Sequence, residues 1–76
     1  MNEQRRKRLS KIKEKLNGLL DEVAEIKDDE QNAFDNLPES IQGSERGERM
    51  SEIIDSLDEV YDSIEAAADN ISEAIE

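Results

Sequence analysis

A seven-residue repeat of apolar side chains runs through both halves of this chain and constrains its fold more than any other feature. Apolar residues follow one another at alternating steps of three and four. This spacing places them along one side of an α-helix and is typical of helices that pack against a neighbouring helix. The first row comprises Leu9, Ile12, Leu16, Leu19, Val23, Ile26, Ala33 and Leu37, and the second comprises Met50, Ile53, Leu57, Val60, Ile64, Ala67, Ile71 and Ala74.

The break between the two rows contains the only proline and two of the three glycines. Pro38 disfavours a helical conformation at the preceding residue and favours the start of a fresh helical turn. Ser44 is a residue type that caps the start of a helix, and glutamates follow it. We therefore predict an all-α antiparallel hairpin with a basic, frayed arm over residues 1–8, a helix over about 9–37, a loop over about 38–47 and a second helix over about 45–75.

A further apolar row lies beside this repeat and is most complete in the second helix. Because two helices share only one seam, this row would leave a sizeable apolar patch on an isolated hairpin. We therefore predict that hairpins assemble into a four-helix bundle or a higher homo-oligomer. The residues predicted at the oligomer interface are Leu20, Phe34, Ile54, Tyr61, Ala68 and Ile75.

The residue types that are missing limit the chemistry of the chain. It has no Cys and no His, which removes disulfides, thiolate zinc sites and the usual general base. It also lacks an apolar run long enough for a membrane span or a signal peptide. We expect a cytoplasmic protein that is not an enzyme and that has no metal, no cofactor and no membrane partner.

Charge is distributed unevenly along the sequence, whose formal net charge is −11. Residues 1–20 hold seven basic and two acidic side chains, residues 21–42 hold one basic and eight acidic, and residues 43–76 hold two basic and 11 acidic. Folding the helices antiparallel brings the basic segment beside the acidic end of the second helix. We expect ion pairs there to select the orientation more than to stabilise the fold. The residues expected to pair are Lys11, Lys13 and Lys15 with Asp69, Glu73 and Glu76.

The loop is the first candidate binding site. Two arginines surround a predicted helix start whose free N–H groups suit a phosphate or a carboxylate. The simpler alternative is that these arginines pair with neighbouring glutamates and that the loop is only a connector. The predicted ligand-binding residues are Ser44, Arg46, Gly47 and Arg49.

The acidic face of the second helix is the other candidate. Its carboxylates suit a basic protein partner and can also imitate the phosphate backbone of DNA, although an ordinary solvated helix has the same composition. The predicted protein-binding residues are Asp55, Asp58, Glu59, Asp62 and Glu65.

Other charged features favour simpler interpretations. Glu30 interrupts the first apolar row and suits a carboxylate that reaches solvent or sets the register of the helices. The acidic run around it lacks the glycine and the bidentate glutamate of a calcium loop. The basic run over residues 5–8 lacks interleaved aromatic residues in a strongly acidic chain, so we do not predict direct binding to nucleic acid.

The segment from Phe34 to Gly47 reads FDNLPESIQGSERG and precedes an acidic helix of repeated Ile/Leu-Asp-Glu units. In this it resembles a family of small uncharacterised helical-hairpin proteins of bacteriophages and prophages. The resemblance covers most of residues 9–76, and its distinctive words are LPES and GSERG. It implies a phage origin, a helical hairpin and a location in the cytoplasm of an infected bacterium.

By analogy with other small phage proteins, the resemblance also implies a role against host immunity. We expect a protein that sequesters a cyclic nucleotide signal as an oligomeric sponge, with the loop residues holding phosphates, or that inhibits a host defence protein. The alternatives are an acidic interaction or DNA-mimic protein, and a structural or assembly protein of the phage.

Overall fold

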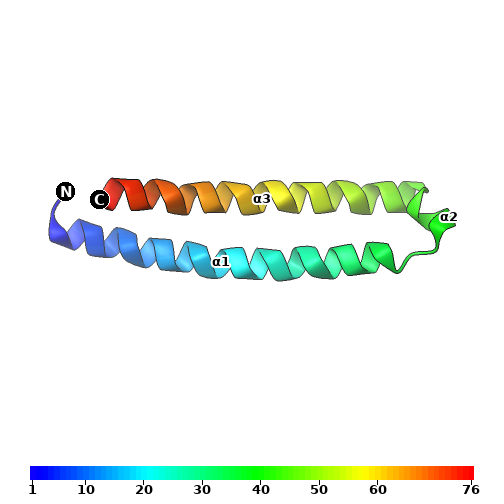
Figure 1. Ribbon diagram of the computed structural model, residues 1–76, viewed down its shortest axis with the longest axis horizontal. Coiled ribbons are helices and arrows are strands. Elements are labelled where there is room, and N and C mark those ends of the chain that lie inside the picture. The colour runs from blue at the N-terminus through cyan, green and yellow to red at the C-terminus, as the bar shows by residue number, and fades with distance from the viewer.

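The computed structural model describes residues 1–76 and contains two long antiparallel helices joined by a short connector (Figure 1). Helix α1 spans Glu3–Asp35, α2 spans Glu39–Gln42 and α3 spans Glu45–Ile75. The Cα atoms extend over 58 × 14 × 12 Å, so the molecule is a rod with both termini at one end. This confirms the prediction of an all-α fold in which two long helices pack together. Neither long helix contains a stretch that is apolar enough to cross a bilayer.

Helix α1 begins at Glu3, earlier than the predicted boundary at residue 9. Asn2 has an extended backbone, and its side-chain oxygen accepts a hydrogen bond from the backbone N–H of Arg5 at 2.9 Å. This bond satisfies one of the N–H groups that a helix leaves free at its start. The prediction of a frayed basic arm is therefore corrected, because the basic residues belong to the first turns of α1.

At the loop end, the side chain of Gln42 closes the last turn of α1. Its Nε2 donates to the carbonyl oxygen of Leu37 at 3.1 Å and to that of Phe34 at 3.2 Å, and it lies 3.5 Å from the carbonyl oxygen of Asp35. Such carbonyls have no partner inside their own helix. Because Gln42 is the last residue of α2, this short helix holds the end of α1 in place.

Helix α2 also packs against the first turn of α3. Gly47 is buried there, and a Cβ atom added to it would lie 2.0 Å from the carbonyl oxygen of Gln42 and 2.6 Å from that of Ile41. A larger residue would have to push the two backbones apart. Position 47 therefore needs glycine for close approach, although its backbone has no positive φ.

The seam between α1 and α3 differs from the predicted one. The residues that step by three and four in each half occupy the a and d positions of a seven-residue repeat, with a at Leu9 and Met50 and d at Ile12 and Ile53. The e position follows d directly. In the structure the helices face each other with their a and e rows, and most of the d rows are exposed. The most exposed large d-row side chains are Ile12 at 46%, Leu19 at 45%, Ile26 at 56% and Val60 at 44%.

The residues predicted for the oligomer interface form the e rows of this internal seam. The structure buries Leu20, Ile54 and Ala68 in the isolated chain, and Phe34, Tyr61 and Ile75 are half-buried. Their assignment to a surface between hairpins is therefore corrected. In α3 the e row holds larger apolar side chains than the d row, so burying it removes more apolar area from water. In α1 the e row includes Lys13 and Lys27, so the choice of seam follows the side chains of α3.

Candidate functional site

The structure places the four predicted loop residues at the start of α3. Ser44 precedes the helix, but its hydroxyl donates to the carbonyl oxygen of Ile41 and makes no side-chain bond to the first turn of α3. Gly47 is buried against α2. Two of the four residues therefore contribute to the structure of the connector.

The two arginines of this group are exposed. Arg49 lies 3.6 Å from the carboxylate of Glu52, and both side chains are about 70% exposed, so the pair is weak. Neither of the two hollows on the chain is lined by a loop residue. The structure brings the four residues together without forming a cavity among them.

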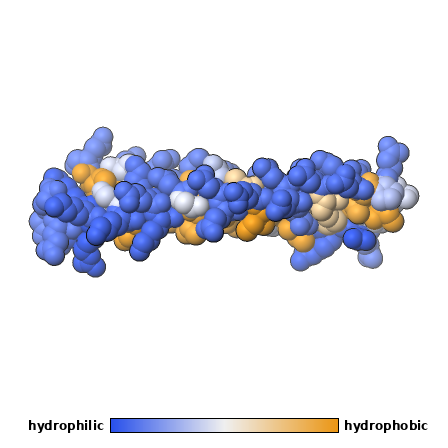
Figure 2. All heavy atoms as spheres, turned by 90° about the horizontal axis from the view of Figure 1, so that it is seen from below, coloured by the Kyte–Doolittle hydropathy of each residue, from blue (hydrophilic) through white to orange (hydrophobic).

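The rod has two broad faces of opposite character. Because α1 and α3 run antiparallel and both turn their a and e rows inward, their d rows lie on the same side of the hairpin. Figure 2 shows hydrophobic residues gathered along one edge of the molecule in a view turned by 90° from Figure 1. We call this surface the apolar face, and it consists of Ile12, Leu19, Ile26, Ala33, Ile53, Val60, Ala67 and Ala74, of which only Ile53 is half-buried.

The opposite broad face is polar. The residues that directly follow each a position lie on this face, and they are mainly Ser, Asn, Gln, Asp and Glu. The five predicted protein-binding carboxylates lie on this face and on the neighbouring outer edge of α3, where all but Asp58 are exposed. The acidic and apolar surfaces of the hairpin therefore point away from each other.

A hollow of about 350 Å³ lies on the polar side between α1 and α3 and is lined by Ala24, Lys27, Asp28, Asp58, Tyr61 and Asp62. The Lys27 ammonium pairs with the carboxylate of Asp58 across the seam. This hydrogen bond raises the pKa of Lys27 above its ordinary value of 10.5, against a smaller opposing effect of desolvation, and Asp28 and Asp62 also raise it. No group of three His, Cys, Asp or Glu side chains is placed to hold a metal ion.

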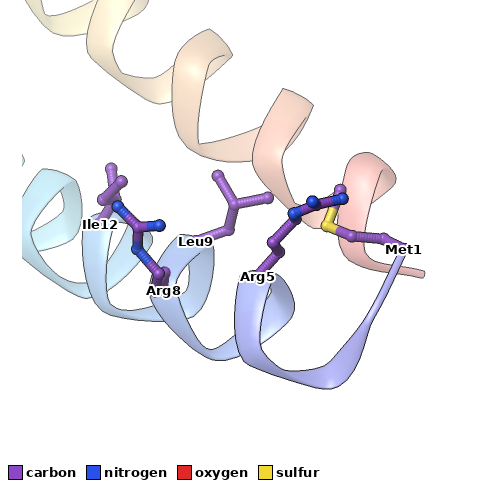
Figure 3. Close-up of a pocket in the computed structure, with 5 residues that line it drawn as sticks. All are labelled: Met1, Arg5, Arg8, Leu9 and Ile12. Atoms are coloured by element: carbon purple, nitrogen blue, oxygen red, sulfur yellow. The ribbon is translucent and has the colours of Figure 1, made fainter.

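A second hollow, of about 280 Å³, lies at the open end of the rod, near the termini (Figure 3). Leu9 and Ile12 point from the first turns of α1, Arg5 and Arg8 lie beside them, and Met1 folds back toward Arg5. Arg5 is seven residues before Ile12, so this hollow continues the apolar face toward the termini. This hollow was not predicted, although Arg5 occupies the d position when the seven-residue repeat is extended toward the N-terminus.

Only two ion pairs form in the chain, namely the Lys27–Asp58 and Arg49–Glu52 pairs. The predicted pairs between the lysines of α1 and the acidic end of α3 are absent, and this prediction is wrong for the single chain. Glu30 is half-buried and makes no ion pair. Most of the charge on the rod is therefore uncompensated.

Comparisons with known proteins do not assign this chain to a family. No protein-family model, curated protein or solved structure matches this chain. The resemblance of the loop segment to phage proteins stays a prediction, and the functional argument depends on the surfaces described above.

Proposed function

We propose that this chain is a non-catalytic binding protein that works as an assembly of hairpins and presents an acidic surface to a basic partner protein. The observation that carries the proposal is the unpaired charge near the loop. Residues 21–64 contain 15 acidic and three basic side chains. Two of those basic residues, Lys27 and Arg49, already have acidic partners within the chain.

Clustered charge of one sign costs a protein self-repulsion and is useful when it attracts an oppositely charged partner. Such a surface speeds association and excludes partners of like charge. In this hairpin the carboxylates lie opposite the apolar face. Once the apolar faces of two hairpins are covered, as in a four-helix bundle, the acidic surface forms the outside of the assembly.

The resemblance to phage proteins extends the proposal to a host protein of bacterial immunity as the partner. Capture of a cyclic nucleotide by the loop has less support, because Ser44 and Gly47 are engaged with α2 and no hollow forms around Arg46 and Arg49. An acidic surface needs no such hollow to bind a basic protein.

Charge reversal tests this proposal. The D55K/D62K variant reverses two exposed carboxylates that form no ion pair within the chain, although Asp62 lies in the hollow beside Lys27. The E73K/E76K variant applies the same charge change at the open end and serves as the matched control. Each tagged protein is expressed in the bacterial host, and the bound proteins are quantified by mass spectrometry.

We expect the native chain and the control to recover the same basic protein, and recovery by D55K/D62K to fall at least about tenfold, which is a loss of about 1.4 kcal/mol. Higher salt should weaken the native complex, because exposed charges are screened. Equal recovery by all three proteins, or recovery of no common partner, would overturn the proposal.

A further inference from the structure

We propose that the apolar face is the docking surface for a second copy of the chain and that the two hairpins dock head to tail, with the loop of one beside the termini of the other. This inference rests on the proposed function for the existence of an assembly. It adds the surface, the orientation and the residues that meet.

The apolar face has the size of a stable interface. The side of the rod on which it lies measures 58 by 14 Å between Cα atoms, an outline of about 800 Å² that includes the charged flanks, and a standard interface buries a similar area on each partner. A row of exposed apolar side chains that runs along both helices is typical of an interaction surface. The single hairpin buries only three apolar side chains, and none of them completely, so a second copy would enlarge a small core.

The charge of the rod selects the head-to-tail orientation. The Lys27–Asp58 pair shows the register of the two antiparallel helices, in which residue 21 of α1 lies across from residue 64 of α3. The loop part, residues 21–64, holds 15 acidic and three basic side chains, whereas residues 1–20 and 65–76 together hold six acidic and seven basic. Docking with both loops at one end would bring two strongly negative regions together. Head-to-tail docking places each negative region beside a nearly neutral one.

The row of α1 on the apolar face is self-complementary in this orientation. A two-fold axis beside Leu19 lays α1 antiparallel to α1 of the second copy, so Leu19 meets the partner's Leu19. Ile12 then meets the partner's Ile26, because both are seven residues from the axis. The hollow at the open end lies across from the partner's Ala33.

The positions that flank this row carry complementary charges. These positions are seven residues apart along α1. Arg8 and Lys15 lie before the axis in the sequence, and Glu22 and Asp29 lie after it. Antiparallel α1 helices therefore place Arg8 beside the partner's Asp29 and Lys15 beside the partner's Glu22. All four side chains are exposed and have no ion pair within their own chain.

The opposite orientation lacks these pairs. With both loops at one end, α1 would face α3 of the second copy. The corresponding flanking positions of α3 are Ser56, Ser63 and Asn70, which carry no charge. In the head-to-tail dimer α3 faces α3 instead, with Ala67 against the partner's Ala67, and such small side chains allow the helices to approach closely.

Single cysteines test the orientation directly, because the chain has none of its own. Leu19→Cys places two thiols across the proposed axis and should give a disulfide-linked dimer on mild oxidation. Asn17→Cys is the matched control, since it is exposed on the opposite face of the same helix. Light scattering after gel filtration measures the mass of the native protein, which should be twice the chain mass of 8.7 kDa.

The outcomes separate this inference from the proposed function. A native protein of chain mass would overturn both the assembly and this inference. An oligomer in which L19C fails to cross-link, or in which N17C cross-links equally well, would overturn only the face and orientation inferred here. Failure of D55K/D62K to lose its partner would overturn only the proposed binding function.

Charge exchange gives a second and independent test. The E22K/D29K variant makes the flanking positions uniformly basic and should weaken dimerisation at least about tenfold. The R8E/K15E/E22K/D29K variant reverses every pair and should restore the native dissociation constant to within about threefold. Circular dichroism of each variant confirms that the helices are retained. A quadruple variant as weak as the double variant would contradict the proposed pairs.

Discussion

The loop end and the open end of the rod are held by different means. At the loop end, the Gln42 side chain binds carbonyls at the end of α1, and Gly47 allows α2 to pack on the first turn of α3. At the open end, the side-chain oxygen of Asn2 caps α1 by accepting from the backbone N–H of Arg5, Met1 is 57% exposed and a hollow lies beside it. The loop end is therefore completed by contacts within one chain, whereas the open end leaves apolar surface uncovered.

This difference between the two ends shows that some residues determine the fold of the hairpin and others determine its assembly. Contacts around α2 determine how the chain turns and how its helices are set against each other. The apolar face and the charged positions beside it, which continue along α1 to the open end, determine what the hairpin can assemble with. Substitutions near α2 should therefore change the stability of the fold, and substitutions near the termini should have mainly local effects.

The largest effect is expected for Gly47→Ala. The added Cβ would lie 2.0 Å from the carbonyl oxygen of Gln42, and separating the two backbones should reduce the free energy of unfolding by about 1–3 kcal/mol. Urea unfolding followed by circular dichroism at one fixed protein concentration measures this change.

Gly43→Ala is the matched control at the loop end. Gly43 has φ −86° and no atom within 4 Å of an added Cβ, so the substitution should change the free energy of unfolding by no more than about 0.5 kcal/mol. If the two substitutions had equal effects, close packing of α2 would not be what requires glycine at position 47.

The next effect compares the two helix ends directly. Gln42→Ala leaves the Leu37 carbonyl without a donor and removes one of two donors to the Phe34 carbonyl, which still accepts from the Leu37 N–H, so the free energy of unfolding should fall by about 1 kcal/mol. Asn2→Ala removes one cap bond at an exposed helix start, where fraying is local. It should raise amide exchange only in the first turn of α1.

Hydrogen exchange with mass spectrometry distinguishes these outcomes. The comparison between the ends predicts that Q42A raises exchange along the seam and that N2A does not. A global loss of protection in N2A, or a purely local one in Q42A, would reverse the assignment of stability to the loop end.

The seven-residue repeat was sufficient to predict the hairpin, and the residue types around Ser44 were sufficient to predict the start of α3 at Glu45, because both depend on local patterns. It was not sufficient to choose the inward rows. In α3 the d and e rows beside Met50, Leu57, Ile64 and Ile71 are both apolar, so the choice depends on the summed packing against α1. The residues predicted for the oligomer interface therefore lie in the seam within the hairpin, and the d rows are exposed in their place.

The roles of the loop residues were also beyond local reasoning. The sequence marks glycine at position 47, but only the backbone position of Gln42 in the folded chain shows why it is needed. In the same way, the amide of Gln42 reaches carbonyls five and eight residues earlier in the sequence, at Leu37 and Phe34. The acidic surface, in contrast, follows from composition and helix spacing alone.

A smaller effect of opposite sign is expected for Gly18→Ala, near the middle of α1. No atom lies within 4 Å of an added Cβ at this position, unlike at Gly47. Alanine favours the helix by lowering the entropy of the unfolded chain, so the free energy of unfolding should rise by about 0.5–1 kcal/mol. Urea unfolding measures it, and destabilisation would show that this part of α1 requires glycine for a reason other than the space around it.

The smallest effect concerns Lys27, whose ammonium pairs with Asp58 between the helices on the loop side of the rod. The folded-state pKa of Lys27 is raised above its ordinary value of 10.5, mainly by the hydrogen bond to Asp58. The stabilisation linked to this shift is therefore fully present below pH 10.5 and is lost as the pH rises through the higher folded-state value. Because both side chains are partly exposed, the effect should be small and screened by salt.

Asp58→Asn isolates this contribution from other groups that titrate at high pH. The free energy of unfolding should differ between the native chain and D58N at pH 8, and the difference should shrink as the pH passes above 10.5. No such pair joins the helices toward the termini, so the control Lys11→Met, at an exposed position outside the proposed dimer pairs, should leave the pH profile of the native chain unchanged in this range. A constant difference between the native chain and D58N at every pH would mean that Asp58 acts through packing and not through the charge of Lys27.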